Sequence, residues 1–122
     1  MSLAIGHFAL GAAATALVVT YLLPKLPYPR TLVLLGGVWS LLPDAAKLFS
    51  AAPRLVAFHD SQWANAFWFH RALDRLDPAD SPRTSALLVA ALLLVTFVVE
   101  RRNYRAHARV REAYDELDLP AR

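Results

Sequence analysis

The chain has 122 residues, enough for one domain, and 57% of them are hydrophobic while only 19% are charged. Soluble domains have about 45–50% apolar and about 25% charged residues, so an ordinary soluble enzyme and a disordered chain are poor descriptions of it. It has no cysteine, which excludes a disulfide scaffold and thiolate chemistry, and its net charge of +3 is too small to indicate nucleic-acid binding.

Long apolar segments predict an all-α integral membrane protein with three transmembrane helices, forming a single membrane domain over residues 1–122. The first span, residues 3–23, contains no Lys, Arg, Asp or Glu, and about 20 apolar residues suffice to cross a bilayer as a helix. Its glycines and alanines let a neighbouring helix approach closely. The second span covers residues 31–49, where Pro43 is expected to kink the helix or begin a new one.

Residues 50–80 are more polar and rich in aromatic side chains. Because Trp and Phe are enriched where helices lie in the membrane interface, we expect a short amphipathic interfacial helix over residues 60–77. This helix would fold over the ends of the spanning helices.

The third span is expected over residues 82–100, with Ser81 as N-cap and Pro82 at the first helical position. Neither Pro nor Gly follows until Pro120, so the helix should continue as a cytoplasmic helical tail over residues 101–118. The tail begins with an arginine-rich stretch and becomes acidic toward its end.

The distribution of Lys and Arg predicts the orientation. The 24–30 link and the tail from residue 100 together hold eight basic and five acidic residues, whereas residues 43–83 hold five of each. Because basic residues near the ends of spans stay in the cytoplasm, we expect a multi-pass protein of the cell membrane with its amino terminus outside and its carboxyl terminus in the cytoplasm.

Histidine and aspartate residues gather on the predicted outer side. His7 lies near the outer end of the first span, Asp44 follows at the end of the second, and His70 and Asp74 share one helical face four residues apart. Imidazole and carboxylate groups that converge at a membrane surface can hold zinc or manganese, which activates water against an ester. Each residue also has a purely structural interpretation, as a packed histidine, a helix cap or the polar face of an amphipathic helix.

Taken in order, these residues resemble a known pattern. Residues 7–11 read His-Phe-Ala-Leu-Gly, residues 41–44 read Leu-Leu-Pro-Asp, and residues 70–71 read His-Arg. The chain thereby resembles the membrane-bound metal-dependent hydrolase family, small bacterial and archaeal proteins with a His-x3-Gly, a Leu-Pro-Asp-x-Asp and a His-Arg-x-x-Thr-His-Ser. The resemblance implies a phosphoester or similar substrate at the membrane surface. The metal ligands it implies are His7, Asp44 and His70.

The chain departs from the family pattern at several positions. Ala46 replaces the family's second Asp, residues 74–76 read Asp-Arg-Leu in place of Thr-His-Ser, and residues 87–99 contain no later His or Asp. Asp74 or His59 could substitute for the missing ligands, and Asp74 is the candidate catalytic residue.

Two functions therefore stay open. The incomplete motif favours a non-catalytic subunit or scaffold of a membrane assembly, for which no cofactor is expected. The alternative is a membrane-surface metallohydrolase that cleaves a phosphoester or lipid-linked substrate with a divalent metal. In both cases the expected partners are membrane lipids and either another membrane protein or a second copy of the chain, and nucleic acid is not expected.

Overall fold

The computed structural model describes residues 3–49 and 51–116, with the backbone alone for residues 103–111 and 114. The described residues form helices and no strand, as the sequence predicts. Three stretches are long and apolar enough to cross a membrane, which is compatible with a multi-pass membrane protein. These stretches are Ala4–Leu22, Pro29–Leu48 and Pro82–Arg102.

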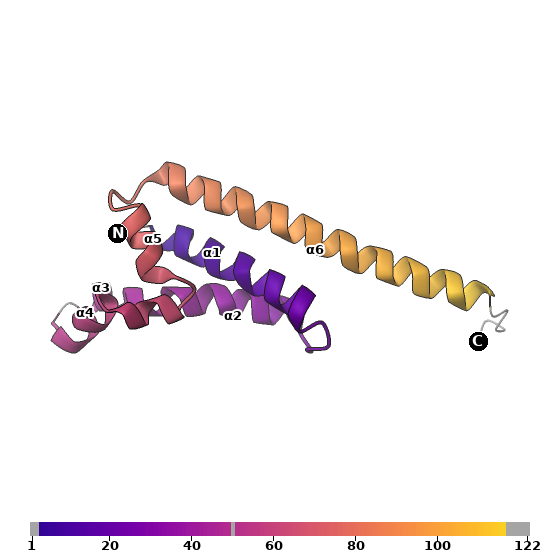
Figure 1. Cartoon of the computed structure of the whole chain (residues 1–122), viewed down its shortest axis with the longest axis horizontal. Helices are drawn as coiled ribbons and strands as arrows, with labels where there is room; N and C mark the ends of the chain where they lie inside the picture. The colour runs from indigo at the N-terminus through magenta and orange to yellow at the C-terminus, as the bar shows by residue number, and fades with distance from the viewer. Residues whose placement is uncertain (1–2, 50, 117–122) are drawn as a thin grey trace.

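Helix α1 (Ala4–Leu17), which a π-helical turn extends to Leu22, lies between α2 (Pro29–Leu41) and α6 (Pro82–Glu116) (Figure 1). Gly11 on α1 is one point of close approach to α2. A Cβ added there would lie 2.6 Å from the carbonyl oxygen of Gly36 and 2.6 Å from the hydroxyl of Ser40, both on α2. Because only glycine leaves room for such a contact, its small residues hold α1 against α2.

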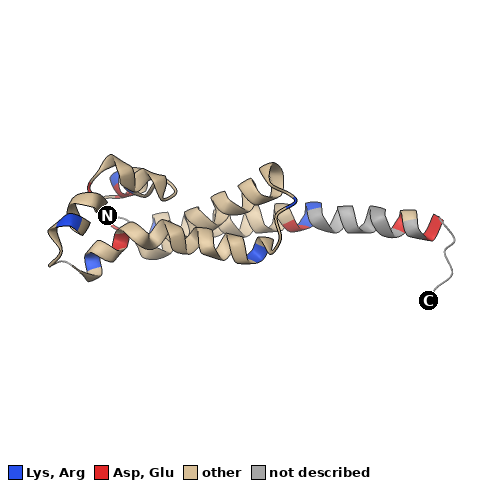
Figure 2. Ribbon diagram, turned by 90° about the horizontal axis from the view of Figure 1, so that it is seen from below, with Lys and Arg blue, Asp and Glu red and all other residues tan. Residues whose placement is uncertain are grey.

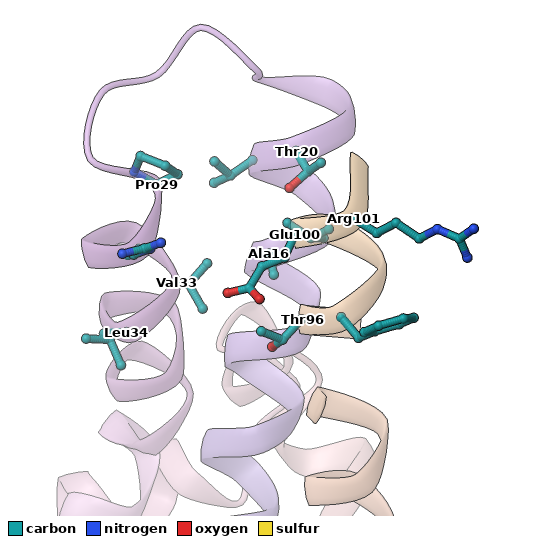
Figure 3. A pocket seen from close by; sticks show the side chains of 12 residues that line it. Ala16, Thr20, Pro29, Val33, Leu34, Thr96, Glu100 and Arg101 are labelled. Carbon is teal, nitrogen blue, oxygen red and sulfur yellow. The ribbon is translucent and has the colours of Figure 1, made fainter. Parts of the chain in front are cut away.

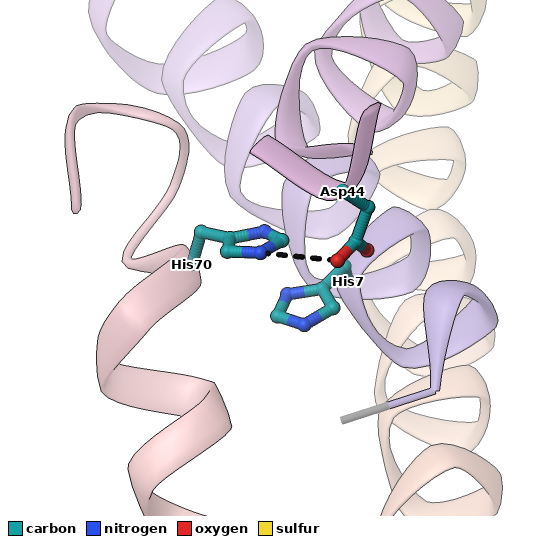
Figure 4. A group of neighbouring side chains, drawn as sticks. All are labelled: His7, Asp44 and His70. Carbon is teal, nitrogen blue, oxygen red and sulfur yellow. Dashed lines mark ion pairs between the residues drawn. The ribbon is translucent and has the colours of Figure 1, made fainter. Parts of the chain in front are cut away.

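Pro43 interrupts the second span, as the sequence predicts. A 3-10 turn over Leu42–Asp44 follows α2, and the short helix α3 covers Ala45–Leu48. Proline lacks the amide hydrogen that an α-helix needs at this position, so the chain tightens into the 3-10 turn. The turn places the side chain of Asp44 beside the beginning of α1 (Figure 4).

The segment predicted as one amphipathic helix over residues 60–77 is divided into shorter elements, which corrects that prediction. These are a 3-10 turn (Gln62–Ala66) and α5 (His70–Leu76), which follow the short helix α4 (Pro53–His59). The break falls at Trp68 and Phe69, whose φ angles of 52° and 59° are left-handed and cannot continue a helix.

Tertiary packing explains this break. The Trp39 indole on α2 donates a hydrogen bond to the Ala66 carbonyl at 3.2 Å, and its ring stacks on Phe67 with centroids 4.5 Å apart. Part of the aromatic segment therefore packs on α2, and these contacts override the helical periodicity of the sequence.

Helix α6 begins at Pro82, where the sequence predicts it. Both carboxylate oxygens of Asp77 accept a hydrogen bond from the Ser81 amide, at 3.0 and 3.1 Å, and fix the chain before the helix. The helix continues past the apolar span to Glu116, so the predicted tail is helical over the described residues. The predicted end of the tail, residues 117–118, lies outside the described residues.

The charged side chains lie near the two ends of the helical bundle and along the extension of α6, whereas the middle of the bundle is free of them (Figure 2). The short elements α3, α4 and α5 gather at the end where the amino terminus lies (Figure 1). Charge at both ends and none between is the pattern of a bundle that spans an apolar layer.

Candidate metal centre

Five imidazole and carboxylate side chains converge at the end of the bundle near the amino terminus. They come from α1, from the 3-10 turn after α2, from the last residue of α4 and from two positions of α5. Two of the imidazoles are fully buried, and the exposed fraction of the other three side chains is between 9% and 11%. We call these residues the His–Asp cluster: His7, Asp44, His59, His70 and Asp74.

The structure brings together the three metal ligands that the sequence predicts. His7, Asp44 and His70 each offer one ligand atom, and these atoms all lie within 4.8 Å of one another (Figure 4). The Nε2 atom of His70 lies 3.4 Å from Oδ1 of Asp44, and its ring stacks on that of His7 with centroids 3.8 Å apart. Side chains 63 residues apart in sequence thus meet at one point because α1 packs against α2 and α5 folds over both.

His59 and Asp74 complete the cluster. The Nε2 atom of His59 lies 3.3 Å from Nε2 of His70, 3.3 Å from Oδ2 of Asp74 and 3.6 Å from Oδ1 of Asp44. From the sequence His59 is expected only as a substitute ligand, since a lone histidine with no partner at helical spacing carries no signal. Asp74, the candidate catalytic residue, lies within 3.7 Å of His70.

Hydrogen bonds at the outer nitrogens orient the three rings. His70 Nδ1 donates to the Ser40 carbonyl at 2.8 Å, His59 Nδ1 to a carboxylate oxygen of Asp60 at 3.2 Å, and His7 Nε2 to Oδ1 of Asp74 at 2.9 Å. Because these oxygens can only accept, each neutral ring carries its hydrogen on that nitrogen. In this neutral form the other nitrogen of each ring presents a lone pair, and Nε2 of His59 and Nε2 of His70 approach each other to 3.3 Å.

The cluster thus gathers electron-rich atoms with few hydrogens between them. Two imidazole lone pairs and the carboxylate oxygens of Asp44 and Asp74 lie 3.3–3.7 Å apart in the pairs given above. His7 adds Nδ1, which is buried and has no hydrogen-bond partner among the described residues. Such an arrangement is costly in a buried site unless a metal cation or an added proton lies among the atoms.

The spacing of these atoms fits a bound metal ion. Ligand atoms that bind one ion tetrahedrally, with bonds of about 2.0–2.2 Å, are roughly 3.3–3.6 Å apart. The triangle formed by Nε2 of His59, Nε2 of His70 and Oδ1 of Asp44 has sides of 3.3, 3.4 and 3.6 Å. A second triangle, formed by the same two nitrogens and Oδ2 of Asp74, has sides of 3.3, 3.3 and 3.7 Å. Each triangle therefore matches one face of such a coordination sphere.

Lys47 lies at the rim of the cluster. Its Nζ atom is 2.7 Å from Oδ1 of Asp44, and 35% of its side chain is exposed to solvent. The ammonium group therefore compensates the negative charge of Asp44 from the solvent side. Buried histidine rings close the opposite side of the cluster.

Ser40 links the elements that carry the cluster. Its buried hydroxyl donates to the His7 carbonyl at 2.6 Å, while its own carbonyl accepts the bond from His70. Asn65 fixes the first turn of α5, because its side-chain oxygen accepts a hydrogen bond from the Ala72 amide at 3.0 Å. Histidine ligands of metals are commonly held by such outer hydrogen bonds.

Comparison with known proteins assigns the chain to no family. No family model, no characterised protein and no solved structure matches the chain. The resemblance to the membrane-bound metal-dependent hydrolases stays an interpretation of the sequence motifs, and the function must be argued from the His–Asp cluster itself.

Proposed function

We propose that the chain is a membrane-surface metallohydrolase whose His–Asp cluster holds one divalent cation, zinc or manganese. The observation that supports this most directly is the convergence of Nε2 of His59 and Nε2 of His70, 3.3 Å apart, on carboxylate oxygens of Asp44 and Asp74, while both Nδ1 atoms are engaged elsewhere. Two buried carboxylates beside them supply the negative charge that favours a cation over a neutral water.

The roles of the residues follow from their contacts. His59 and His70 offer Nε2 as ligands, and Asp44 offers Oδ1. Asp74 offers Oδ2, because its Oδ1 already accepts the hydrogen bond from His7. Through that bond Asp74, expected from the sequence as the catalytic residue, acts both as a ligand and as the group that orients His7.

Nδ1 of His7 is buried and has no hydrogen-bond partner among the described residues, and it would replace one of these ligands so that a position stays open for water. A bound divalent cation of this kind supplies a nucleophile at neutral pH by lowering the pKa of water, and it polarises an ester. The chain itself contributes a rigid donor set and a buried surrounding. Lys47, exposed at the rim, is placed to attract an anionic group such as a phosphoester.

The paired ends of the apolar stretches support a position of the site at the membrane surface. His7 lies near the start of the first apolar stretch and Asp44 near the end of the second, and in a membrane-embedded bundle such ends would meet water. We propose the cell membrane as the location, with the amino terminus and the His–Asp cluster outside and the tail of α6 in the cytoplasm, on the basis of the Lys and Arg distribution. The substrate would then be a phosphoester or lipid-linked ester reached from the outer surface.

Elemental analysis of the purified full chain in detergent tests the metal site. We expect close to one equivalent of zinc or manganese per chain, and loss of most of it in His70→Ala and Asp44→Asn. His107→Ala, in the C-terminal half of α6, and Asp115→Asn, an exposed residue of the same helix, are matched controls that should keep the metal. Less than a tenth of an equivalent in the unaltered chain after incubation with either metal would end the proposal.

Hydrolysis is tested separately with bis-p-nitrophenyl phosphate on the metal-loaded chain. The proposal predicts turnover that disappears in Asp44→Asn and survives in Asp115→Asn. A chain that holds a full equivalent of metal and hydrolyses neither this diester nor the corresponding monoester would be a structural metalloprotein.

The length of α6 favours a second candidate, the non-catalytic subunit or scaffold. The helix continues from the end of the apolar stretch at Arg102 to Glu116, farther than a span requires. A helix that projects from a membrane is suited to docking a partner or a second copy. This candidate predicts that removal of residues 103–122 abolishes a defined complex while the metal content stays unchanged.

A further inference from the structure

A cleft of about 1070 Å³ lies between α1, α2 and α6 at the opposite end of α1 from the His–Asp cluster (Figure 3). It is lined by the end of α1 and the π-helical turn after it, including Ala16 and Thr20, by the first turns of α2 and by the middle of α6. It shares no residue with the His–Asp cluster, so it is independent of the proposed metal chemistry.

The walls of the cleft change character with depth. Val33 and Leu34 on α2 and Phe97 on α6 form apolar walls. Arg30 and Glu100 line the cleft nearer its mouth, one residue inside the beginning of the second apolar stretch and two residues before the end of the third. Since these stretches end where the bilayer becomes polar, the apolar walls face the hydrocarbon and the charged residues lie at the depth of the lipid headgroups.

The mouth carries charges of both signs. The Glu100 carboxylate points into the cleft from α6, whereas the Arg101 side chain extends away from it (Figure 3); Arg30 lines the cleft from α2. Arg102 lies nearby, held over the Tyr21 ring at 4.5 Å. A carboxylate beside an apolar wall is stabilised by a cationic hydrogen-bond donor, and basic pockets between spanning helices bind lipid phosphates.

The cleft is also open to the membrane. Only 6% of the residues in the apolar stretch of α6 are buried within the chain, because α6 touches α1 along a narrow strip. In a bilayer the remaining surface must be covered by lipid or by another helix, and the opposite charges of Arg30 and Glu100 complement a zwitterionic lipid headgroup.

We propose that this cleft binds one phospholipid with a primary-amine headgroup, phosphatidylethanolamine, whose acyl chain lies along the apolar walls. The lipid phosphate contacts Arg30, and the ammonium donates to Glu100. A phosphatidylglycerol headgroup would leave Glu100 without a cation, and a choline headgroup carries a positive charge but no N–H donor.

Native mass spectrometry of the full chain in detergent, titrated with lipids of identical acyl chains, tests the site. Phosphatidylethanolamine should bind about tenfold more tightly than phosphatidylcholine, the equivalent of one charge-assisted hydrogen bond. Glu100→Gln should remove this preference and leave binding of phosphatidylcholine unchanged. Arg30→Gln should lower the affinity for both lipids alike, since both carry the phosphate.

Two further variants locate the binding. Val33→Trp fills the cleft from α2 and should lower the affinity for both lipids, whereas Arg54→Gln, an exposed arginine on α4 at the other end of the bundle, should change neither. Tighter binding of phosphatidylglycerol than of phosphatidylethanolamine, or an unchanged preference in Glu100→Gln, would overturn the proposal. A dimer that Val33→Trp converts to a monomer would overturn it too, because a second copy would then occupy the cleft.

Discussion

The contact between α1 and α2 should control the metal site, and Gly11→Ala perturbs that contact directly. The added Cβ would lie 2.6 Å from the Gly36 carbonyl oxygen, where an ordinary contact begins at 3.4 Å. Because the obstacle is helix backbone, the two helices must separate locally by roughly 0.8 Å, a form of overpacking. The hydroxyl of Ser40 lies equally close to the new atom, so its 2.6 Å bond to the His7 carbonyl is disturbed as well.

The size of the effect follows from three contributions. Overpacking of a tight contact costs about 1–3 kcal/mol. Loss of the Ser40 hydrogen bond adds about 1 kcal/mol, and the better helix propensity of alanine returns about 1 kcal/mol. We therefore expect Gly11→Ala to lower the free energy of unfolding by about 1–3 kcal/mol, and to lower metal affinity because His7 moves away from the cluster.

Gly37→Ala is the matched control, since it has the same propensity gain. Its Cβ would meet only the Phe8 ring, at 2.5 Å, and a half-buried side chain can rotate away. Unfolding by sodium dodecyl sulfate titration and elemental analysis should rank the two variants, with Gly11→Ala the less stable and the poorer in metal. A Gly11→Ala chain as stable and as rich in metal as the unaltered one would refute this account of the helix contact.

Three further variants test the surroundings of the cluster. Lys47→Met removes an ammonium that lies 2.7 Å from Asp44 and opposes an incoming cation, so competition with a metal chelator should show about two- to fivefold tighter metal binding; weaker binding would contradict this. Asp60→Ala frees the His59 ring from its 3.2 Å hydrogen bond, and metal affinity should fall about tenfold with the stoichiometry unchanged at saturation. Asp77→Ala removes a buried carboxylate that caps the start of α6, and the free energy of unfolding should fall by about 1–2 kcal/mol while metal content stays the same.

The sequence predicts the three apolar helices well because their signal is local. Length, hydropathy and the absence of charge are sufficient to locate them, and Pro43 and Pro82 mark a break and a start through the missing amide hydrogen. The helix over residues 60–77 is not predicted correctly, since its break depends on Trp39 from a distant helix. Periodicity contains no information about such a contact.

The candidate site is predictable from the sequence only where its residues have a local signal. His7, Asp44 and His70 stand out through motif spacing, and Asp74 through its helical distance from His70. His59 has no comparable signal, because its place in the cluster is set by the turn after α4 and by the packing of α5 over α1. Only the fold shows that its Nε2 faces that of His70.

The central claim, one divalent cation held by the His–Asp cluster, is tested most directly by X-ray absorption at the zinc edge of the purified, zinc-loaded chain. We predict a first shell of nitrogen and oxygen alone at about 2.0–2.2 Å, with the outer-shell scattering of at least two imidazoles. Replacement of His59 by Ala should remove part of that imidazole signal and His107→Ala none of it. A zinc-free chain, or a shell without imidazole scattering, would contradict the claim.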